Sequence, residues 1–322
     1  MRHVSHTSLF PTSVVGFASV TLAESAKLAQ NELVAGVIEN VITVNRMFNV
    51  LPFDGIDGNA LAYNRENALG DVDVEGVGDT IGSKAAATFT QVTSTLTSII
   101  GDAEVNGLIQ ATRSGDGTDQ TAVQIASKAK SAGRKYQDML INGSGSSNQF
   151  NGLINLTTSG QTVSGATNRE VLSFTGMDNV IDLVTDKDGV VDYFTMHART
   201  IRSYMALLRA LGGAGIGETV TLPGGDQVPG YRGIPIFRND WIPITQTQGT
   251  SSTCTTYFAG TFDDGSRTVG LAGLTAERQS GINVVDVGES ETKDERIWRV
   301  KWYAGLALFS EKGLAAHDGI SA

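Results

Sequence analysis

The sequence predicts an α+β fold, and three features of its 322 residues carry this prediction. A helical pattern runs without interruption over residues 119–142, with apolar side chains recurring at three- and four-residue spacing. Two long polar segments flank an acidic, glycine-containing loop between residues 54 and 104, as expected for an extended β-hairpin. Most of the chain after residue 230 consists of short runs with strand composition. One long helix among many strands indicates a mixed α+β chain.

The amino-acid composition narrows the class of protein. Hydrophobic residues make up 40% and charged residues 18%, so the chain is not intrinsically disordered. The net charge of -10 argues against a broad basic surface for nucleic acid. The single cysteine, Cys254, excludes an internal disulfide and fits a reducing compartment. No apolar run approaches the length of a membrane span, so no membrane partner is expected.

The first part of the chain, residues 1–53, is expected to form an exposed N-terminal arm and a first helix. A signal peptide is the less favoured interpretation, because Pro11, Ser13 and the histidines interrupt the apolar stretch. Residues 21–24 have the form of a capping box, and the predicted helix continues to about Val44.

The hairpin of residues 54–104 is expected to project. Its outgoing strand carries Leu61 and Tyr63, and a threonine-rich segment, residues 86–97, returns. Two long strands with polar faces form a hairpin that one subunit cannot stabilise alone, so a partner is expected to lie against it. The loop between the strands carries four acids that are candidates for contact with another subunit: Asp71, Asp73, Glu75 and Asp79.

Two other interpretations of the acidic loop stay open. It could be a solvated loop without a partner. It also copies the opening of a calcium-binding loop, but Gly82 stands where the bidentate acid belongs and no helix precedes it. No metal site is therefore predicted.

The helix of residues 119–142 would span roughly 36 Å and ends at Gly143. Its apolar side is expected to be mostly alanine and therefore to pack closely: Ala122, Ile125, Ala126, Ala129, Ala132, Tyr136, Met139 and Leu140. Basic residues on this helix and on a later one are the candidate partners of the acidic loop of a neighbouring chain: Lys128, Lys130, Arg134, Lys135, Arg199 and Arg202.

The remaining elements are shorter. Helices are predicted at residues 178–184 and 198–211, with a strand at 193–196 between them. Residues 212–235, rich in glycine and with two prolines, are expected to form a mobile or partner-ordered loop. Five strands are predicted after it, at residues 234–237, 255–259, 269–272, 284–287 and 296–303.

Signatures of an enzyme are missing from the sequence. The four histidines form no HExxH pattern, and there is no phosphate-binding GxxxxGK[ST] loop or GxSxG nucleophile turn. Cys254 lies among threonines without a neighbouring base, so a structural thiol is favoured over a nucleophile. We therefore predict no catalytic residues and no cofactor.

Several short sequence motifs follow one another in a characteristic order, beginning at the end of the long helix. They are MLING at 139–143, FNGL at 150–153, FTMH at 194–197, GIPI at 233–236, YFAGTF at 257–262 and the paired-strand segment 296–308. This order resembles that of tailed-bacteriophage major capsid proteins with the HK97 fold, across essentially the whole chain. The resemblance implies an N-terminal arm, an E-loop hairpin (residues 54–104), a peripheral domain with a spine helix (residues 105–175 and 285–322) and an axial domain (residues 176–284).

The resemblance also implies a function. The chain would assemble into hexamers and pentamers that close an icosahedral head around double-stranded DNA, located in the virion and, during assembly, in the host cytoplasm. A separate scaffolding protein, a portal and decoration proteins would be partners, and the packaged DNA would make only weak, non-specific contact. Lys84 lies near the hairpin, but the asparagine and acid of a covalent crosslink have no match, so no crosslink is expected.

Three other functions stay open from the sequence. An encapsulin-type compartment shares the fold and encloses a cargo enzyme instead of a genome. A β-rich adhesin or glycan-binding module would fit the Thr, Ser and Gly content, but the long helix counts against it. A hydrolase is disfavoured because the nucleophile and base pattern is missing.

Overall fold

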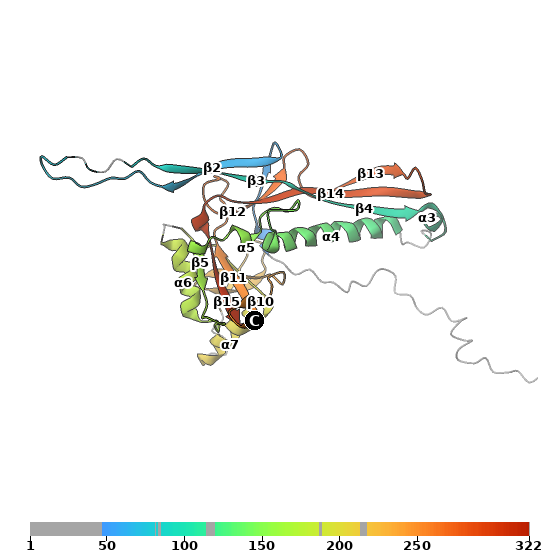
Figure 1. The fold of residues 1–322 in the computed structure, drawn as a ribbon. Helices are drawn as coiled ribbons and strands as arrows, with labels where there is room; N and C mark the ends of the chain where they lie inside the picture. The colour runs from blue at the N-terminus through green and yellow to red at the C-terminus, as the bar shows by residue number, and fades with distance from the viewer. Residues whose placement is uncertain are drawn as a thin grey trace, which may run out of the picture. The chain divides into compact units, whose positions relative to one another are not determined.

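The computed structural model describes residues 47–80, 82, 85–113, 120–186, 189–212 and 218–321. These residues belong to one compact unit, Val41–Ala322. The expected N-terminal arm, the expected first helix and Lys84 lie outside the described residues. Two sheets, one long helix and an extended hairpin make up the described unit (Figure 1).

The first sheet has five strands and is organised around one long strand, β14 (Glu295–Leu308). Along one edge, β14 pairs with β4 (Thr97–Asn106) over ten antiparallel positions. Its other edge pairs with β13 (Asn283–Glu289) and then with β12 (Leu271–Ala276), which in turn pairs with β1 (Phe53–Ile56). β14 therefore pairs with three of the other four strands, and β1 joins the sheet through β12.

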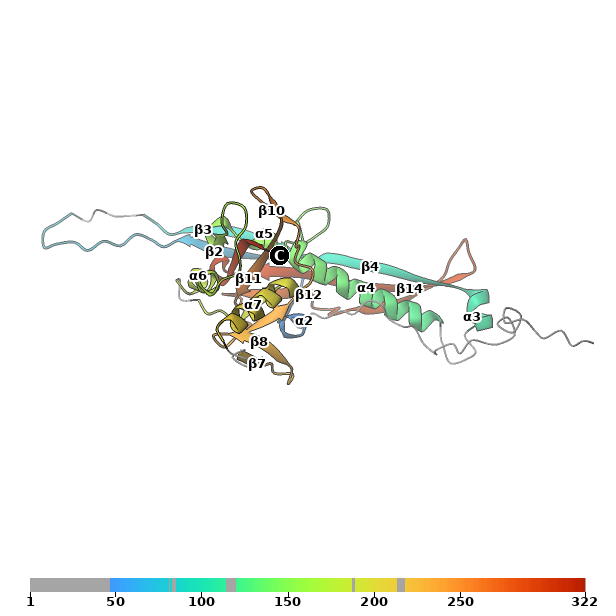
Figure 2. The same cartoon turned by 90° about the horizontal axis from the view of Figure 1, so that it is seen from below.

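The long helix α4 (Gln120–Asn142) packs on β4 and β14, which confirms its prediction within one residue (Figures 1 and 2). The short α3 (Gly107–Arg113) precedes it. Only the C-terminal half of α4 is buried, and Ala122 and Ala126, predicted to be buried, are exposed. The alanine spacing was correct for a helix face, but among the described residues the first turns are only partly covered, by contacts such as the hydrogen bond from Thr121 to Gln110 of α3.

An aromatic cluster fixes the C-terminal half of α4 to the sheet. The Tyr136 ring is fully buried and lies 4.7 Å from Trp302 of β14 and 5.4 Å from Phe150, measured between ring centroids. Phe48 of α2 (Met47–Val50) and Phe53 of β1 complete the cluster, each 5.7 Å from Tyr136. Helix, sheet and the start of the described chain thus share one core.

The second sheet has eight strands. Its order is β5-β15-β11-β6-β9-β8-β7, and β10 also pairs with β11. The bounds are β5 Thr162–Ser164, β6 Tyr193–Met196, β7 Glu218–Thr221, β8 Gln227–Tyr231, β9 Ile234–Arg238, β10 Gln246–Gln248, β11 Ser251–Gly260 and β15 Leu314–Ser321.

Two helices contribute to the core of this sheet: α6 (Phe174–Thr185) and α7 (Ala198–Ala210). Short helical turns occur at α5 (Leu153–Leu156), Ser159–Gln161 and Glu311–Gly313. The predicted helices at 178–184 and 198–211 and the strand at 193–196 are confirmed.

The prediction of a loop over residues 212–235 is wrong for residues 218–235, while residues 213–217 lie outside the described residues. This segment contains the β7–β8 hairpin, in which Val220 pairs with Val228. The turn closes through a hydrogen bond from Leu222 N–H to Asp226 O, with Gly225 at a φ of +85°. Glycine and proline supply the turn and the bend here, and their density hid the short alternating strands.

The strands predicted near the C-terminus are present, with one shift. The strand expected at residues 269–272 begins two residues later, at Leu271. Gly270 adopts a φ of +94°, in the region that favours glycine, and it lies against the backbone of Phe262. The chain therefore turns at Gly270 before it enters the sheet.

The predicted hairpin is present as a separate two-stranded sheet of β2 (Ala60–Ala68) and β3 (Thr88–Thr95) (Figure 1). Its outer part makes few contacts, as expected. Its root does not match the expectation of a hairpin unsupported by its own subunit, because Leu61 and Tyr63 pack beside a small core that includes Phe309. The sequence pattern did not show this core, because its members come from distant parts of the chain.

Candidate assembly surfaces

The hairpin tip is the most exposed part of the described chain. All four predicted acids are exposed, as are the flanking residues 66–80. Two of the acids hold the tip together: Asp79 Oδ2 accepts a hydrogen bond from Gly76 N–H (2.9 Å), and Glu75 Oε1 accepts one from Gly82 N–H (2.9 Å). The tip therefore has a defined local geometry, and its carboxylates face solvent.

Valines alternate with the acids at the tip, a feature that the sequence reasoning missed. Val72 is 88% exposed, and Val74 and Val77 are fully exposed. The run Asp-Val-Asp-Val-Glu carries this signal in the sequence. The tip thus exposes both carboxylates and apolar side chains.

The predicted basic residues of α4 have different surroundings. The side chains of Lys128 and Lys130, near the middle of the helix, are exposed. Lys135 pairs with Asp138 of the same helix, with 3.2 Å between Nζ and Oδ2. The Arg134 guanidinium lies over the Trp241 ring, 5.6 Å from its centroid. Arg134 is therefore already engaged within the subunit.

The same region ties the end of α4 to the chain after β9. Asn142 Nδ2 donates to the carbonyl oxygen of Trp241 (3.0 Å) and to Asp138 Oδ1 (3.0 Å). Together with Arg134, this bond places the loop that carries Trp241 against the last turns of the helix. This contact could not be predicted from the sequence, because the residues are about one hundred positions apart.

The other two predicted basic residues, Arg199 and Arg202, are exposed on α7. His197 caps this helix: its Nδ1 accepts a hydrogen bond from Arg199 N–H (3.0 Å), which requires a neutral ring. Burial lowers the pKa of His197, although Asp240, 3.9 Å from its Nε2, acts in the opposite direction. Arg199, Arg202 and Arg238 lower the pKa further.

We expect the cap at His197 to make stability depend on pH. The pKa is lower in the folded chain than its ordinary value of 6.5, so the folded state binds fewer protons. The stabilisation is complete above about pH 6.5 and is lost as the pH falls through the folded value. His197→Asn keeps a capping acceptor that does not titrate.

The variant should therefore lose less stability than the natural chain between about pH 7 and pH 5, by about 1 kcal/mol or, for a chain of this length, about 1–2 °C in Tm. Thermal unfolding followed by circular dichroism at both pH values measures the difference. Equal losses in the two proteins would contradict the role of the cap.

The described residues offer little for catalysis. They include no group of three or more His, Cys, Asp or Glu side chains that could hold a metal ion. Cys254 is buried, and its Sγ lies 3.6 Å from the carbonyl oxygen of Asn168. It borders a cavity of about 420 Å³ whose other polar side chains are those of Thr, Gln and Asp318. In the part of the chain described, no helix is long and apolar enough to cross a membrane.

Solved structures with the same arrangement are capsid and encapsulin shells. The holo-SrpI encapsulin complex from Synechococcus elongatus PCC 7942 is 17% identical, with a TM-score of 0.71 over 93% of this chain and 95% of that chain. The capsid of cyanophage A-1(L) is 13% identical, with a TM-score of 0.70 over 92% and 98%. The capsid of a native GTA particle is 12% identical, with a TM-score of 0.66 over 95% and 100%. These likenesses confirm the predicted HK97 fold.

Comparison of the sequence itself separates the predicted families. No curated protein sequence matches the chain. A family model does match, that of the type 2A encapsulin shell protein SrpI-like, over residues 118–320. It corresponds to the function first considered as an alternative, an encapsulin-type compartment, more closely than to a phage head. This chain, a shell-forming protein with the HK97 fold, belongs to the family of SrpI-like type 2A encapsulin shell proteins.

Proposed function

We propose that this chain is the structural subunit of an encapsulin-type compartment, a closed shell that encloses protein cargo. The match to the SrpI-like family over residues 118–320 carries the proposal, because it runs from the start of α4 to the last strand, β15. The chain would hold the shell together through many subunit contacts, and any catalysis would be carried out by the cargo.

The architecture suggests a division of labour within the subunit. We assign α4 and the five-stranded sheet to the peripheral domain and the eight-stranded sheet with α6 and α7 to the axial domain. This assignment would place four strands outside the ranges first expected for their domains. β12 and β4 pair with β14 of the five-stranded sheet, and β15 and β5 belong to the eight-stranded sheet. The hairpin of β2 and β3 would be the E-loop that reaches a neighbouring subunit.

Charge and exposure support a specific docking surface for the hairpin tip. Its acids Asp71, Asp73, Glu75 and Asp79 complement Lys128 and Lys130 of a neighbour. Its valines complement the small, uncovered side chains in the first turns of α4, such as Ala122 and Ala126. Arg134, which lies over the Trp241 ring, and Lys135, which pairs with Asp138, are further candidates on the same helix. Arg199 and Arg202 remain candidates for contacts between axial domains.

A second candidate function is the head of a tailed phage, favoured by the likeness to the cyanophage capsid over nearly the whole of both chains. Hexamers, pentamers, a portal, a scaffolding protein, decoration proteins and packaged double-stranded DNA would then be the partners, and the virion the location. The net charge of -10 would limit the grip of the shell on DNA.

The contents of natural particles distinguish the two functions. Particles are isolated from cells that naturally carry this chain, treated with nuclease, and analysed for nucleic acid and for co-purifying protein. A compartment would contain a stoichiometric second protein and no protected genome. Nuclease-resistant double-stranded DNA of uniform length would overturn the encapsulin proposal in favour of the phage head.

A further inference from the structure

The root of the hairpin is held by one face of β2. Burial along β2 alternates, with Leu61, Tyr63 and Arg65 partly buried and their neighbours exposed, and the alternation ends at Arg65. From Glu66 onward the strand is exposed on both sides. On the paired strand β3 the partly buried residues begin one pair nearer the root, at Val92 opposite Tyr63. Arg65 is thus the last partly buried residue of β2.

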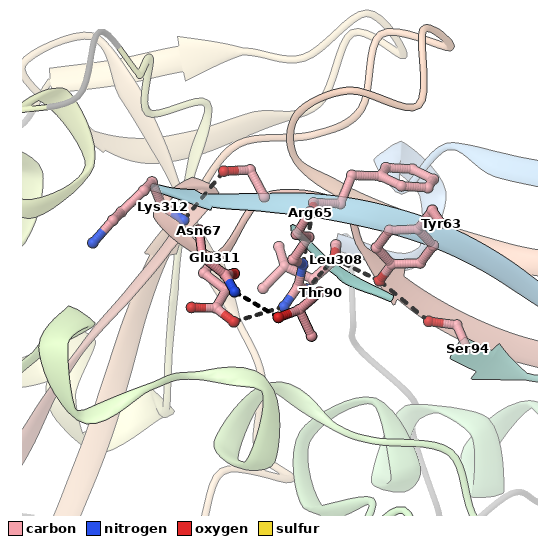
Figure 3. A network of polar contacts seen from close by, with 10 residues as sticks. Tyr63, Arg65, Asn67, Thr90, Ser94, Leu308, Glu311 and Lys312 are labelled. Atoms are coloured by element: carbon pink, nitrogen blue, oxygen red, sulfur yellow. Dashed lines mark hydrogen bonds and ion pairs between the residues drawn. The ribbon is translucent and has the colours of Figure 1, made fainter. Parts of the chain in front are cut away.

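Arg65 grips the chain where β14 ends (Figure 3). Its Nε donates to the carbonyl oxygen of Phe309 (2.9 Å), and its Nη2 donates to that of Leu308. Its Nη1 forms an ion pair with Glu311 Oε1 (2.8 Å). All three contacts join positions more than 240 residues apart. One planar guanidinium therefore donates to two carbonyl oxygens and one carboxylate in the segment that connects β14 to β15.

Tyr63 supports this grip from the same face. Its hydroxyl donates to the carbonyl oxygen of Leu308 (2.7 Å), and its ring meets that of Phe309 edge to face at 5.2 Å. The Arg65 guanidinium lies 5.6 Å from the centre of the Tyr63 ring. Its side chain is only 14% exposed, so these contacts are partly shielded from water. The two side chains brace each other as well as the corner.

We propose that Arg65 is a positioning residue that sets the direction of the hairpin in the free subunit, so that assembly uses a preformed arm with its pivot at Arg65. We call the contacts of Arg65 with Leu308, Phe309 and Glu311 the Arg65 clamp. The expected effect on assembly rests on the proposed shell function, but the clamp itself is a property of the single chain. It predicts an ordered root up to Arg65 and an arm beyond it that moves independently.

The two carbonyl contacts of Arg65 and its ion pair with Glu311 differ in expected strength. The fork of an arginine reaches two carbonyl oxygens and a carboxylate at once, which a lysine ammonium cannot reproduce. The Glu311 side chain is 46% exposed, so its ion pair with Arg65 is screened by water and salt. The two carbonyl contacts should therefore matter more than the ion pair.

The first test is hydrogen exchange in the unassembled full-length chain, separated by gel filtration. Arg65→Met should raise the exchange rates of the β2 and β3 amides at the root at least about tenfold, and Arg65→Lys should raise them nearly as much. Glu311→Gln should change them less than about threefold. Arg278→Met is the matched control, because Arg278 forms only a long, exposed pair with Asp57 (3.8 Å) near the same sheet. Amides of α4 report that the body stays folded.

The second test is the rate of shell formation, followed by light scattering. Arg65→Met should slow assembly at least about tenfold, while Arg278→Met should assemble like the natural chain. Root amides that already exchange as fast in the natural chain as in Arg65→Met would overturn the clamp. Faster exchange without slower assembly would retain the clamp but overturn its role in assembly. A chain that forms no shells in any variant would count against the proposed function, and the exchange result would stand independently.

Discussion

Tyr136→Ala is expected to lower the free energy of unfolding by about 3–5 kcal/mol. The ring is fully buried at the centre of the aromatic cluster that joins α4, β14 and the start of the described chain. Its removal would leave a cavity against Trp302 and Phe150, and neighbouring rings cannot fill it without leaving their own contacts. Chemical denaturation followed by tryptophan fluorescence measures the loss.

Tyr136→Phe is the matched control. It keeps the ring and removes only the hydrogen bond from the hydroxyl to the carbonyl oxygen of Gly305 (3.2 Å), at an expected cost of about 1 kcal/mol. If the alanine variant were no less stable than the phenylalanine variant, the cluster would not be the connection between helix and sheet.

Neutralising the hairpin tip is expected to raise the subunit concentration needed for assembly about tenfold. The substitutions are Asp71→Asn, Asp73→Asn, Glu75→Gln and Asp79→Asn. If each of the four carboxylates loses about 0.4 kcal/mol of attraction to the basic residues of a neighbour, the total is about 1.6 kcal/mol, which corresponds to a factor of slightly more than ten. Light scattering over a dilution series measures this concentration. Added salt should weaken assembly of the natural chain toward that of the variant.

A charge exchange tests the partner of the tip. Replacing the four acids with lysine should prevent assembly, and adding Lys128→Glu and Lys130→Glu to that variant should partly restore it. The thermal midpoint of the unassembled chain should stay nearly constant, because all six side chains are exposed. If the combined variant assembled no better than the lysine variant, α4 would not be the docking surface.

Local patterns in the sequence were enough to predict most of the elements. The bounds of α4 followed from its apolar spacing and the glycine at its end. The strands β6, β9, β13 and β14 were predicted near their observed places. The segment containing β7 and β8 was not, because turn-forming residues outnumber the few that alternate. The few alternating residues there indicate strands, whereas the glycines and prolines indicate a loop. The pairing of β8 with β9 stabilises the strands.

Contacts between distant segments could not be predicted. The grip of Arg65 on Leu308 and Phe309 and the contact of Arg134 with Trp241 depend on how sheets and loops meet in space. The candidate acids were identified correctly as exposed, but the valines between them were overlooked. The order of the elements likewise indicated the HK97 fold, whereas the choice between an encapsulin and a phage head depends on details that this order does not contain.

The central claim is that the chain is a subunit of a closed shell, and electron microscopy of the purified full-length chain, combined with sizing over a range of concentrations, tests it most directly. We expect closed particles of uniform diameter, or hexamers and pentamers in equilibrium with them, with the hairpin of each subunit lying over a neighbour. A well-behaved monomer at every concentration would contradict the account.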